Sequence, residues 1–430
     1  MNFWSRFLYG SGGFAMHASN FLIVTWLTKF YTPSSGENLI SPVLFGYIFL
    51  VGRIVDAVTD PVVGYWSDHH EGKRGRRFPF IAWGAPFLAI FLIASFTPPM
   101  AHESSWNALY LLLVMAGFFF FSTIVVTPYL SLIPELTTEP KERIDLTTYQ
   151  AAFVLVATIF VAVASGPLIE LLGYFYFMLM AGTLVFLAAI APLKVIEKKA
   201  YKHTGETKSG LKEIVGWTFS TLKNKPFRHV LLSTSLFWFG LSLLMAGVAL
   251  WVTNVLGGKE SDVALVMGPL IVSNIIGFIL FNRLARAKGK YIAFVITLIS
   301  MMLIAPIWFF VHRTSGELPF LQAMILFFLL GFPIAGFQVL PFAILADVID
   351  HDEQQQGERR EAIYFGMQAI VQKTVIGIAM VVLQYMRISF GESLALRLIG
   401  PIVGVSCLFG IFFFRGYSLR EKTLLPDSSS

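Results

Sequence analysis

The feature that most constrains this chain is a succession of long apolar segments. A helix needs about 20 apolar residues to cross a bilayer core, and the sequence divides into twelve such segments. They cover residues 7–31, 42–67, 79–98, 107–134, 149–172, 174–195, 229–256, 262–286, 291–312, 319–348, 362–388 and 394–415. Because 56% of the residues are hydrophobic and only 13% are charged, a soluble fold is excluded. The pattern predicts an all-α membrane protein with twelve transmembrane helices.

The basic residues predict how these helices are oriented. Of the 32 Lys and Arg residues, 25 fall on the side of the membrane that holds both termini. Five fall on the opposite side, and two, Arg53 and Lys373, lie inside apolar segments. The positive-inside rule therefore places both termini in the cytoplasm. The net charge of +6 then describes the cytoplasmic face, so we expect no nucleic-acid partner.

A polar stretch at residues 196–228 divides the chain into two halves of six segments each. We expect an N-terminal bundle at 1–195, a cytoplasmic linker at 196–228, a C-terminal bundle at 229–415 and a tail at 416–430. The halves resemble each other. Pro128 and Pro341 stand 213 positions apart, and Tyr149 and Tyr364 stand 215 apart. Such a parallel repeat predicts two six-helix bundles related by an axis along the membrane normal.

Charged residues inside an apolar segment are costly and indicate a function. The segment GRIVDAVTDP contains Arg53, Asp56 and Asp60, whose spacings of three and four residues place them on one helical face. Arg53 neutralises one carboxylate and leaves one negative charge. A proton or an alkali cation would neutralise the other, because carboxylates and hydroxyls are hard oxygen ligands.

Lys373, near the middle of segment 362–388, admits two interpretations. It could supply the missing positive charge and close a purely structural ion network without any bound cation. Alternatively, it could compete with a cation for Asp56 and Asp60, which would couple cation binding to movement of the two halves. The residues alone leave both interpretations open.

The loop after segment 42–67 contains Asp68, Arg76 and Arg77, which could form a gate at the cytoplasmic side. Guanidinium groups form charge-assisted bonds with carboxylates. We expect their partners in the acidic stretch 347–361, which includes Asp347, Asp350 and Glu361. The alternative is an ordinary basic loop that obeys the positive-inside rule.

Several classes of chemistry are absent from the sequence. It has no GxxxxGK[ST] phosphate loop, no GxSxG motif and no HExxH motif. A single cysteine, Cys407, excludes a disulfide framework and a cysteine metal site. We therefore expect neither an enzyme nor a bound cofactor or metal, and any pumping would use an ion gradient. Short outer loops and charges in mid-membrane favour a monomeric carrier over an oligomeric channel.

Two long motifs resemble a known family. GRIVDAVTDPVVGYWSDHHEGKRGRRFPFIAWGAPF and LADVIDHDEQQQGERREAIYFGMQAIVQK resemble the two signatures of the glycoside–pentoside–hexuronide:cation symporters, the sodium/melibiose symporter group of the major facilitator superfamily. TPYLSLIPE and KNKPFR also fit, and the resemblance covers essentially the whole chain. It implies the major facilitator fold and transport by alternating access. Animal sodium-dependent lysophosphatidylcholine symporters share the pattern.

The resemblance also implies roles for single residues. Asp56, Asp60 and Thr123 match the cation site, and Lys373 matches the lysine of helix eleven. The chain also departs from melibiose transporters at two positions. Val126 in helix four and His17 in helix one stand where those transporters have acidic residues. Gln150 stands where an arginine is expected after Tyr149, and Leu130 replaces a tryptophan of helix four. These changes weaken the case for a galactoside substrate and for a strict sodium requirement.

The sequence thus predicts symport of a sugar, glycoside or similar small organic solute with Na⁺ or H⁺ as co-substrate, in a bacterial inner membrane. The expected substrate-binding residues are His17, Asn20, Tyr149, Gln150, Gln372 and Lys373. Two alternatives stay open: a cation-dependent symporter or flippase for lysolipids, and a non-transporting sensor or scaffold.

Overall fold

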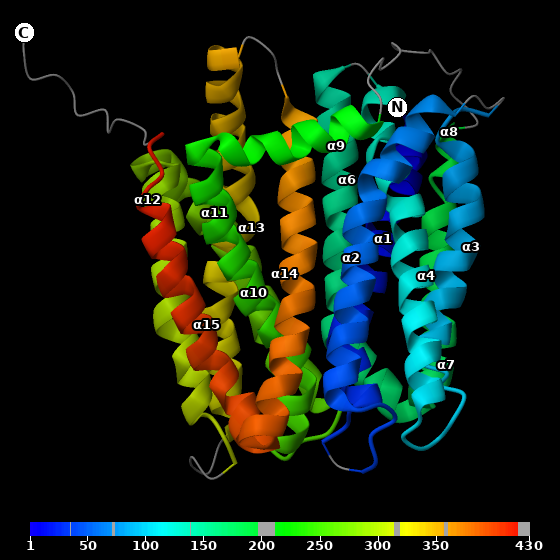
Figure 1. Cartoon of the computed structure of the whole chain (residues 1–430), viewed down its shortest axis with the longest axis vertical. Coiled ribbons are helices and arrows are strands. Elements are labelled where there is room, and N and C mark those ends of the chain that lie inside the picture. The colour runs from blue at the N-terminus through cyan, green and yellow to red at the C-terminus, as the bar shows by residue number, and fades with distance from the viewer. Residues whose placement is uncertain are drawn as a thin grey trace, which may run out of the picture.

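The computed structural model describes residues 1–34, 36–70, 74–137, 139–196, 211–313, 319–356 and 360–419. Within these ranges the chain is helical, with no β-strand. Long helices stand side by side, and one short amphipathic helix, α9, lies across one end of them (Figure 1). This arrangement agrees with the predicted all-α membrane fold.

The first half contains α1 (Phe3–Tyr31), α2 (Pro42–His69), α3 (Phe78–Ala94), α4 (Ser105–Leu130), α5 (Leu132–Leu136), α6 (Pro140–Ile159), the π-helical η1 (Phe160–Ala164), α7 (Ser165–Ile190) and α8 (Leu193–Ile196). The second half contains α9 (Leu211–Ser220), η2 (Thr221–Lys223), α10 (Lys225–Asn254), α11 (Asp262–Lys288), α12 (Lys290–Ile304), η3 (Ala305–Phe310), α13 (Pro319–Gln356), α14 (Glu361–Phe390) and α15 (Glu392–Phe414). The two halves lie beside each other, with α1 to α8 on the right of Figure 1 and α10 to α15 on the left.

Among the described residues, nine helical stretches are long and apolar enough to cross a membrane, and α3 is a shorter apolar helix of 17 residues. One of the nine, Lys141–Ile196, joins two of the predicted segments. The chain is therefore a multi-pass membrane protein. The count of twelve crossings, the side of the termini and the division into two bundles stay predictions.

Two glycines make similar breaks in the helical chain. Gly173 interrupts α7 with φ 75° and ψ 164°, and Gly391 separates α14 from α15 with φ 76° and ψ 160°. A positive φ of this kind is easy for glycine and strained for other residues. The two turns have nearly equal backbone angles at matching places in the two halves. Gly173 also lies at the predicted boundary between segments 149–172 and 174–195.

Some helix boundaries differ from those expected. Helix α6 begins at Pro140 instead of near residue 149, because proline suits the first turn of a helix. Helix α13 continues to Gln356, past the predicted end at 348, because the polar residues after that point include no Pro or Gly to stop it. Both extensions lie at the end of the molecule where α9 lies, which we call the inner end; the opposite end is the outer end.

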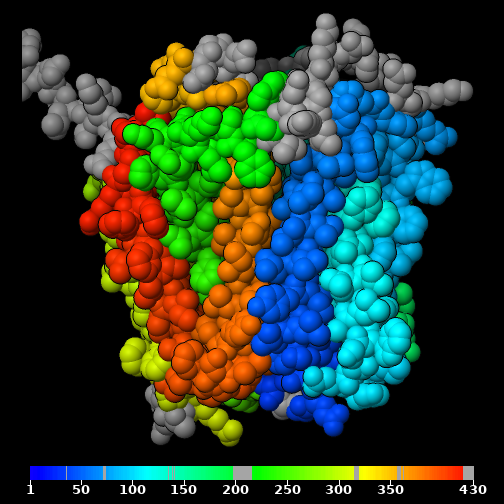
Figure 2. Space-filling view, viewed as in Figure 1, coloured from blue at the N-terminus to red at the C-terminus, as the bar shows by residue number. Residues whose placement is uncertain are grey.

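Several helix pairs join the two halves. Helix α2 packs against α14, α1 against α10, and η1 with α7 against α11. Figure 2 shows α14 lying directly beside α2 along the face that it displays. At the inner end, α9 contacts both α2 and α14. The α2–α14 contact is the one that brings the predicted charges together.

Candidate functional site

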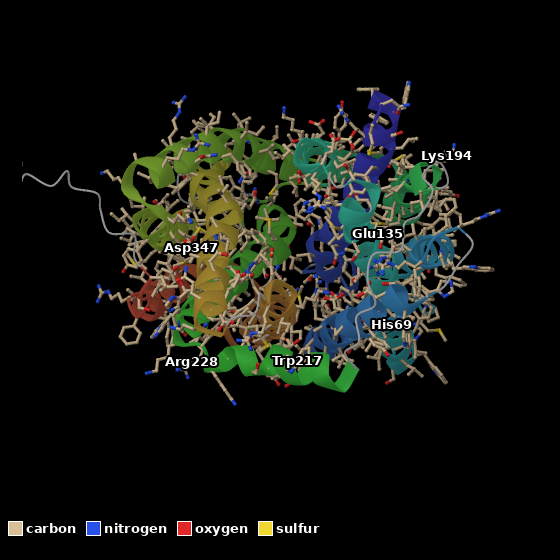
Figure 3. All side chains as sticks on the ribbon, turned by 90° about the horizontal axis from the view of Figure 1, so that it is seen from above. His69, Glu135, Lys194, Trp217, Arg228 and Asp347 are labelled. Carbon is tan, nitrogen blue, oxygen red and sulfur yellow. The ribbon has the colours of Figure 1, made fainter. Side chains whose placement is uncertain are left out.

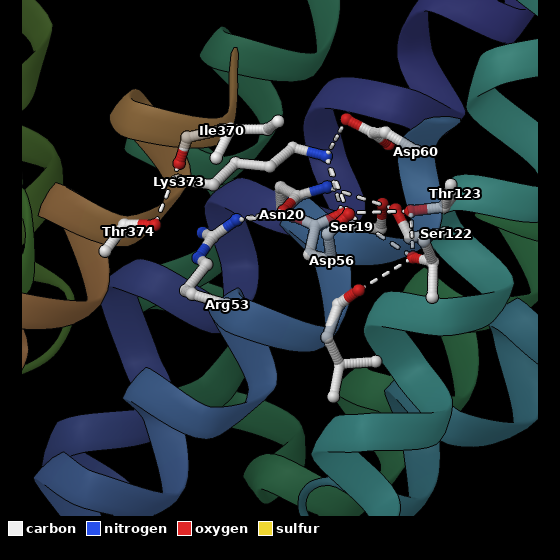
Figure 4. Close-up of polar contacts among 12 residues, drawn as sticks. Ser19, Asn20, Arg53, Asp56, Asp60, Ser122, Thr123, Ile370, Lys373 and Thr374 are labelled. Atoms are coloured by element: carbon white, nitrogen blue, oxygen red, sulfur yellow. Dashed lines mark hydrogen bonds and ion pairs between the residues drawn. The ribbon is translucent and has the colours of Figure 1, made fainter. Parts of the chain in front are cut away.

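The four mid-membrane charges form one cluster between α2 and α14 (Figure 4). The ammonium Nζ of Lys373 lies 2.7 Å from Oδ1 of Asp56 and 2.6 Å from Oδ2 of Asp60. Arg53 donates to Oδ2 of Asp56 over 3.3 Å. Lys373 thus binds both carboxylates from the opposite half of the protein.

The cluster is electrically neutral as it stands, because two cations face two carboxylates. Arg53 and Asp56 are buried, with 5% of each residue exposed. The side chains of Lys373 and Asp60 are 21% and 26% exposed. The Arg53–Asp56 pair is therefore enclosed in the interior. The Lys373–Asp60 pair is partly exposed, where a cation could replace the ammonium group.

Glycines explain why α14 comes close enough for Lys373 to reach α2. A Cβ on Gly377, one turn from Lys373, would lie 3.0 Å from the Cα of Leu50 and 3.3 Å from the Cβ of Arg53. A Cβ on Gly46 would lie 3.0 Å from the Cα of Val381. Small residues let membrane helices approach at backbone distance. The short spacing places the lysine amine at hydrogen-bond distance from the carboxylates.

Oxygen ligands surround the position of the ammonium group. Nζ of Lys373 also lies 3.4 Å from the main-chain oxygen of Asp56. Thr123 of α4 donates to Oδ1 of Asp56 over 3.0 Å, and Thr59 lies 3.3 Å from Thr123. Pro61 has no N–H, so the carbonyl of Ala57 lacks its usual helical donor close to Asp60. This set of carboxylate, hydroxyl and carbonyl oxygens suits an alkali cation.

Asn20 connects α1 to the cluster. Its Oδ1 accepts from Arg53 over 3.2 Å, and its Nδ2 donates to Ser122 of α4 over 3.4 Å. The guanidinium of Arg53 lies 4.5 Å from the ring centre of Phe119, a cation–π distance. Asn20 therefore belongs to the charge cluster, in addition to its predicted place in the substrate site.

The other predicted substrate residues lie around α1 and α14. His17 packs its ring against Phe21 of the same helix. Tyr149 and Gln150 of α6 contact α1 at Gly10 and Gly13, nearer the inner end than His17. Gln372 is half-buried on α14, next to Lys373 in the sequence. The structure thus brings Asn20 and Lys373 to the cluster, and it places Tyr149 and Gln150 at a different level of the bundle.

The inner-end arginines have partners that the sequence did not predict, while their contact with the acidic stretch 347–361 stays a prediction. Arg76 lies 2.7 Å and Arg77 3.1 Å from Oε1 of Glu135 in α5, and Arg77 also pairs with Asp68. These groups all belong to the first half. The ion pairs form locally because α5 brings Glu135 beside the loop that follows α2.

The acidic groups of the second half have partners of their own. Asp347 binds Lys290 over 2.6 Å, and Asp352 binds Arg360 over 2.7 Å. Asp350 and Glu361 are exposed. Seen from the inner end, Glu135 and Asp347 lie over different halves (Figure 3). The ion pairs of Arg76 and Arg77 with Glu135 and of Lys290 with Asp347 therefore each form within one half.

At the outer end, in contrast, ion pairs and hydrogen bonds join the halves. Lys29 of α1 binds Glu260 over 2.7 Å. Arg387 of α14, only 6% of which is exposed, donates over 2.7 Å to both Oγ1 and the main-chain oxygen of Thr32, the C-cap of α1. A cation at a helix C-terminus is favourable. These contacts close the outer end.

The pKa of Glu260 reports on this closure. Burial raises the pKa of its carboxyl, but the hydrogen bond and the charge of Lys29 outweigh that effect, so the net pKa lies below its ordinary value of 4.5. The closed outer end therefore favours the ionised carboxylate.

Sequence reasoning missed several residues of these networks. Thr59 and Ser122 contact cluster residues, and both stand next to residues that the sequence did identify, Asp60 and Thr123. Glu135 entered only as the last residue of TPYLSLIPE, a segment that fits the family resemblance. Lys29 and Arg387 counted only among the five basic residues of the outer side, and no sequence signal pointed to Glu260, Thr32 or Glu392.

Comparison with known proteins gives one family match and several relatives. The family model described as MFS/sugar transport protein matches residues 8–391. The isoprimeverose transporter of Lactiplantibacillus pentosus is 24% identical over 385 residues, which cover 87% of this chain and 78% of the relative. The putative glycoside/cation symporter YagG of Escherichia coli K12 is also 24% identical and covers 83% of this chain and 76% of its own length.

A solved structure agrees with the fold. The inward-facing, occupied form of a bacterial homologue of the human lysosomal transporter Spinster superposes with a TM-score of 0.69. It covers 96% of this chain and 95% of its own length at 12% sequence identity. At that identity the likeness concerns the arrangement of the helices alone.

Proposed function

Because this chain belongs to the MFS/sugar transport protein family, we propose that it carries a sugar-like solute together with a monovalent cation bound at Asp56 and Asp60. The predicted family, the major facilitator fold and the assignment as a transporter instead of an enzyme are confirmed. The coupling ion, the solute and the roles of single residues are the parts that we propose.

The observation that carries the proposal is the position of Lys373. Its ammonium contacts Asp56 and Asp60 at 2.7 and 2.6 Å and lies 3.4 Å from the carbonyl oxygen of Asp56. An alkali cation would use the same oxygens, with Thr123 as a further ligand. We therefore favour Na⁺ over H⁺, since a proton needs a single oxygen and gains nothing from such a cage.

The transport cycle then follows from the contacts between the halves. With the outer end closed by Lys29 and Arg387, and with the pairs Arg76–Glu135 and Lys290–Asp347 each formed within one half, we take this state to be the inward-facing one. A cation that displaces Lys373 removes a bond between α2 and α14. Once the solute is bound as well, loss of this bond lets the halves change their relative position, as alternating access requires.

Asp56→Asn tests the cation site. Purified protein is titrated with Na⁺, and in parallel with protons, while its thermal stability is followed; a ligand that binds only the folded state raises that stability. We expect the wild type to be stabilised by Na⁺ and the variant to be insensitive. Asp145→Asn, at an exposed ion pair with Arg6, is the matched control and should respond like the wild type.

Uptake into liposomes completes the test. The wild type should accumulate a solute from a panel of sugars and glycosides only when a cation gradient is present, and Asp56→Asn should not. Full gradient-driven uptake by Asp56→Asn would refute the site. Accumulation of lysolipids instead of sugars would keep the cation site and replace the sugar-like solute.

A further inference from the structure

The charges in the middle of the described spans sum to zero. Arg53 and Lys373 balance Asp56 and Asp60. Other charged groups of the inter-half contact are paired near the outer end, as Lys29 is with Glu260 and Arg387 with Glu392. The imidazole of His17 is uncharged at neutral pH. The mid-membrane site is therefore neutral before any cation enters.

A cation that binds Asp56 and Asp60 adds one positive charge, whether it is Na⁺ or H⁺. The bound cation, Arg53 and the two carboxylates then form a neutral group by themselves. Lys373 loses both of its carboxylate partners. An ammonium without a counter-charge is unfavourable in a low-dielectric interior. The cation-loaded site therefore lacks one negative charge.

In the described part of the chain, the residues of α1 and α4 that lie at the cluster do not supply that charge. One turn along α4 from Thr123, which contacts Asp56, the side chain is the apolar Val126. On α1, Ser19 and Asn20, which lie beside the cluster, are neutral. Lys373 itself keeps 21% of its side chain exposed, so it is not sealed inside the protein.

We propose that the solute itself carries the missing charge: a monovalent organic anion whose carboxylate or phosphodiester group binds Lys373 once a cation has taken its place. This inference rests on the proposed function and names its substrate class. Charge-assisted hydrogen bonds from the ammonium hold the anionic group, and Gln372 adjoins it as a neutral hydrogen-bonding group. One cation and one anion then cross together without net charge.

Matched ligand pairs test this inference through the linkage between two binding sites. Na⁺ affinity is measured in the presence of methyl β-glucuronide or methyl β-glucoside, which differ by a carboxylate in place of a hydroxymethyl group. Methyl β-galacturonide with its galactoside, and lysophosphatidylglycerol with monoacylglycerol, form two further pairs. The sugar and lipid pairs distinguish the two sources of an anionic group.

At least one anion of the panel should raise the Na⁺ affinity about fivefold or more, the lower range of typical couplings, and its neutral partner should not. Lys373→Gln should abolish this difference. An equal effect of the neutral partner, or no effect of any anion on a protein that binds Na⁺, would overturn the inference.

Transport in liposomes gives an independent readout. Uptake of the anion with Na⁺ should be unchanged when the membrane potential is set with a K⁺ gradient and valinomycin, because no net charge moves. Cation-driven uptake of a neutral sugar that generates a current would overturn the inference and leave the proposed function intact. Absence of any cation dependence, with Asp56→Asn behaving like the wild type, would instead reject the proposed function.

Discussion

Replacement of Lys373 by glutamine should turn a protein that is stable without cations into one that needs them. In the structure the ammonium of Lys373 neutralises Asp56 and Asp60 from the opposite half. Lys373→Gln keeps the length of the side chain nearly unchanged and removes the charge. Without a cation, the two carboxylates then repel each other, and only Arg53 balances them.

The size of the effect follows from the burial of the cluster. Removal of one partner from a buried ion pair costs about 3–5 kcal/mol. Because the side chains of Lys373 and Asp60 are 21% and 26% exposed, we take the lower end, about 3 kcal/mol. In the wild type, a cation that binds must overcome this same interaction of Lys373 with the carboxylates. In the variant that interaction is absent. At about 1.4 kcal/mol per tenfold change, the affinity for Na⁺ should rise roughly 100-fold.

Thermal unfolding in detergent across a Na⁺ titration measures both quantities. The variant should unfold at a lower temperature than the wild type without Na⁺, and Na⁺ should restore most of the loss. Lys290→Gln provides the matched control, since Lys290 binds Asp347 at the inner end with about a third of both side chains exposed. Exposed pairs contribute about 0–1 kcal/mol, so this variant should show no Na⁺-dependent recovery.

The contradicting result is that Lys373→Gln binds Na⁺ no better than the wild type. In that case the lysine does not compete with the cation, and the cluster is the structural network that was the other interpretation of the sequence. An equal loss of stability with and without Na⁺ would lead to the same conclusion.

Three further predictions concern the contacts between the halves. Gly377→Ala should destabilise the protein by about 1–3 kcal/mol, because its Cβ would lie 2.7 Å from a methyl group of Leu50; Gly366→Ala, with open space around it, should be neutral in the same unfolding assay. Because the pKa of Glu260 is lowered from 4.5 in the closed state, its contribution to closure is complete above about pH 4.5 and is lost as the pH falls through the lowered value. Spin-label distances across the outer end should lengthen over that range, and Glu260→Gln should remove the dependence. Arg387→Gln should disfavour the closed outer end by about 3 kcal/mol, seen as longer outer distances in the same measurement; an unchanged distance distribution would show that Thr32 is held by other contacts.

Local spacing made part of the site predictable. Spacings of three and four residues put Arg53, Asp56 and Asp60 on one face of any helix, so the sequence alone identified the acidic side of the cluster. The break at Gly173 was predictable for a similar reason, because the boundary between two neighbouring apolar segments can be read from the local sequence.

Contacts that depend on how the halves meet were not predictable in the same way. The pairing of Arg76 and Arg77 with Glu135 requires α5 to fold back beside the loop after α2. The bond from Arg387 to Thr32 joins positions 355 residues apart, and neither residue has a local pattern that reveals the other. Such pairs depend on how distant helices pack together. The spacing of residues in a single sequence does not reveal that packing.

The reach of Lys373 across the interface also has a consequence for leakage. A resting carrier keeps its carboxylates covered by its own amine, so a cation that arrives alone must expel that amine into an environment with no counter-charge. Half-loaded carriers would therefore be rare, and those that form would tend to release the cation on the side from which it came. Tight coupling would then be a property of the empty site. The site itself would prevent leakage of the cation down its gradient, with no separate gating element.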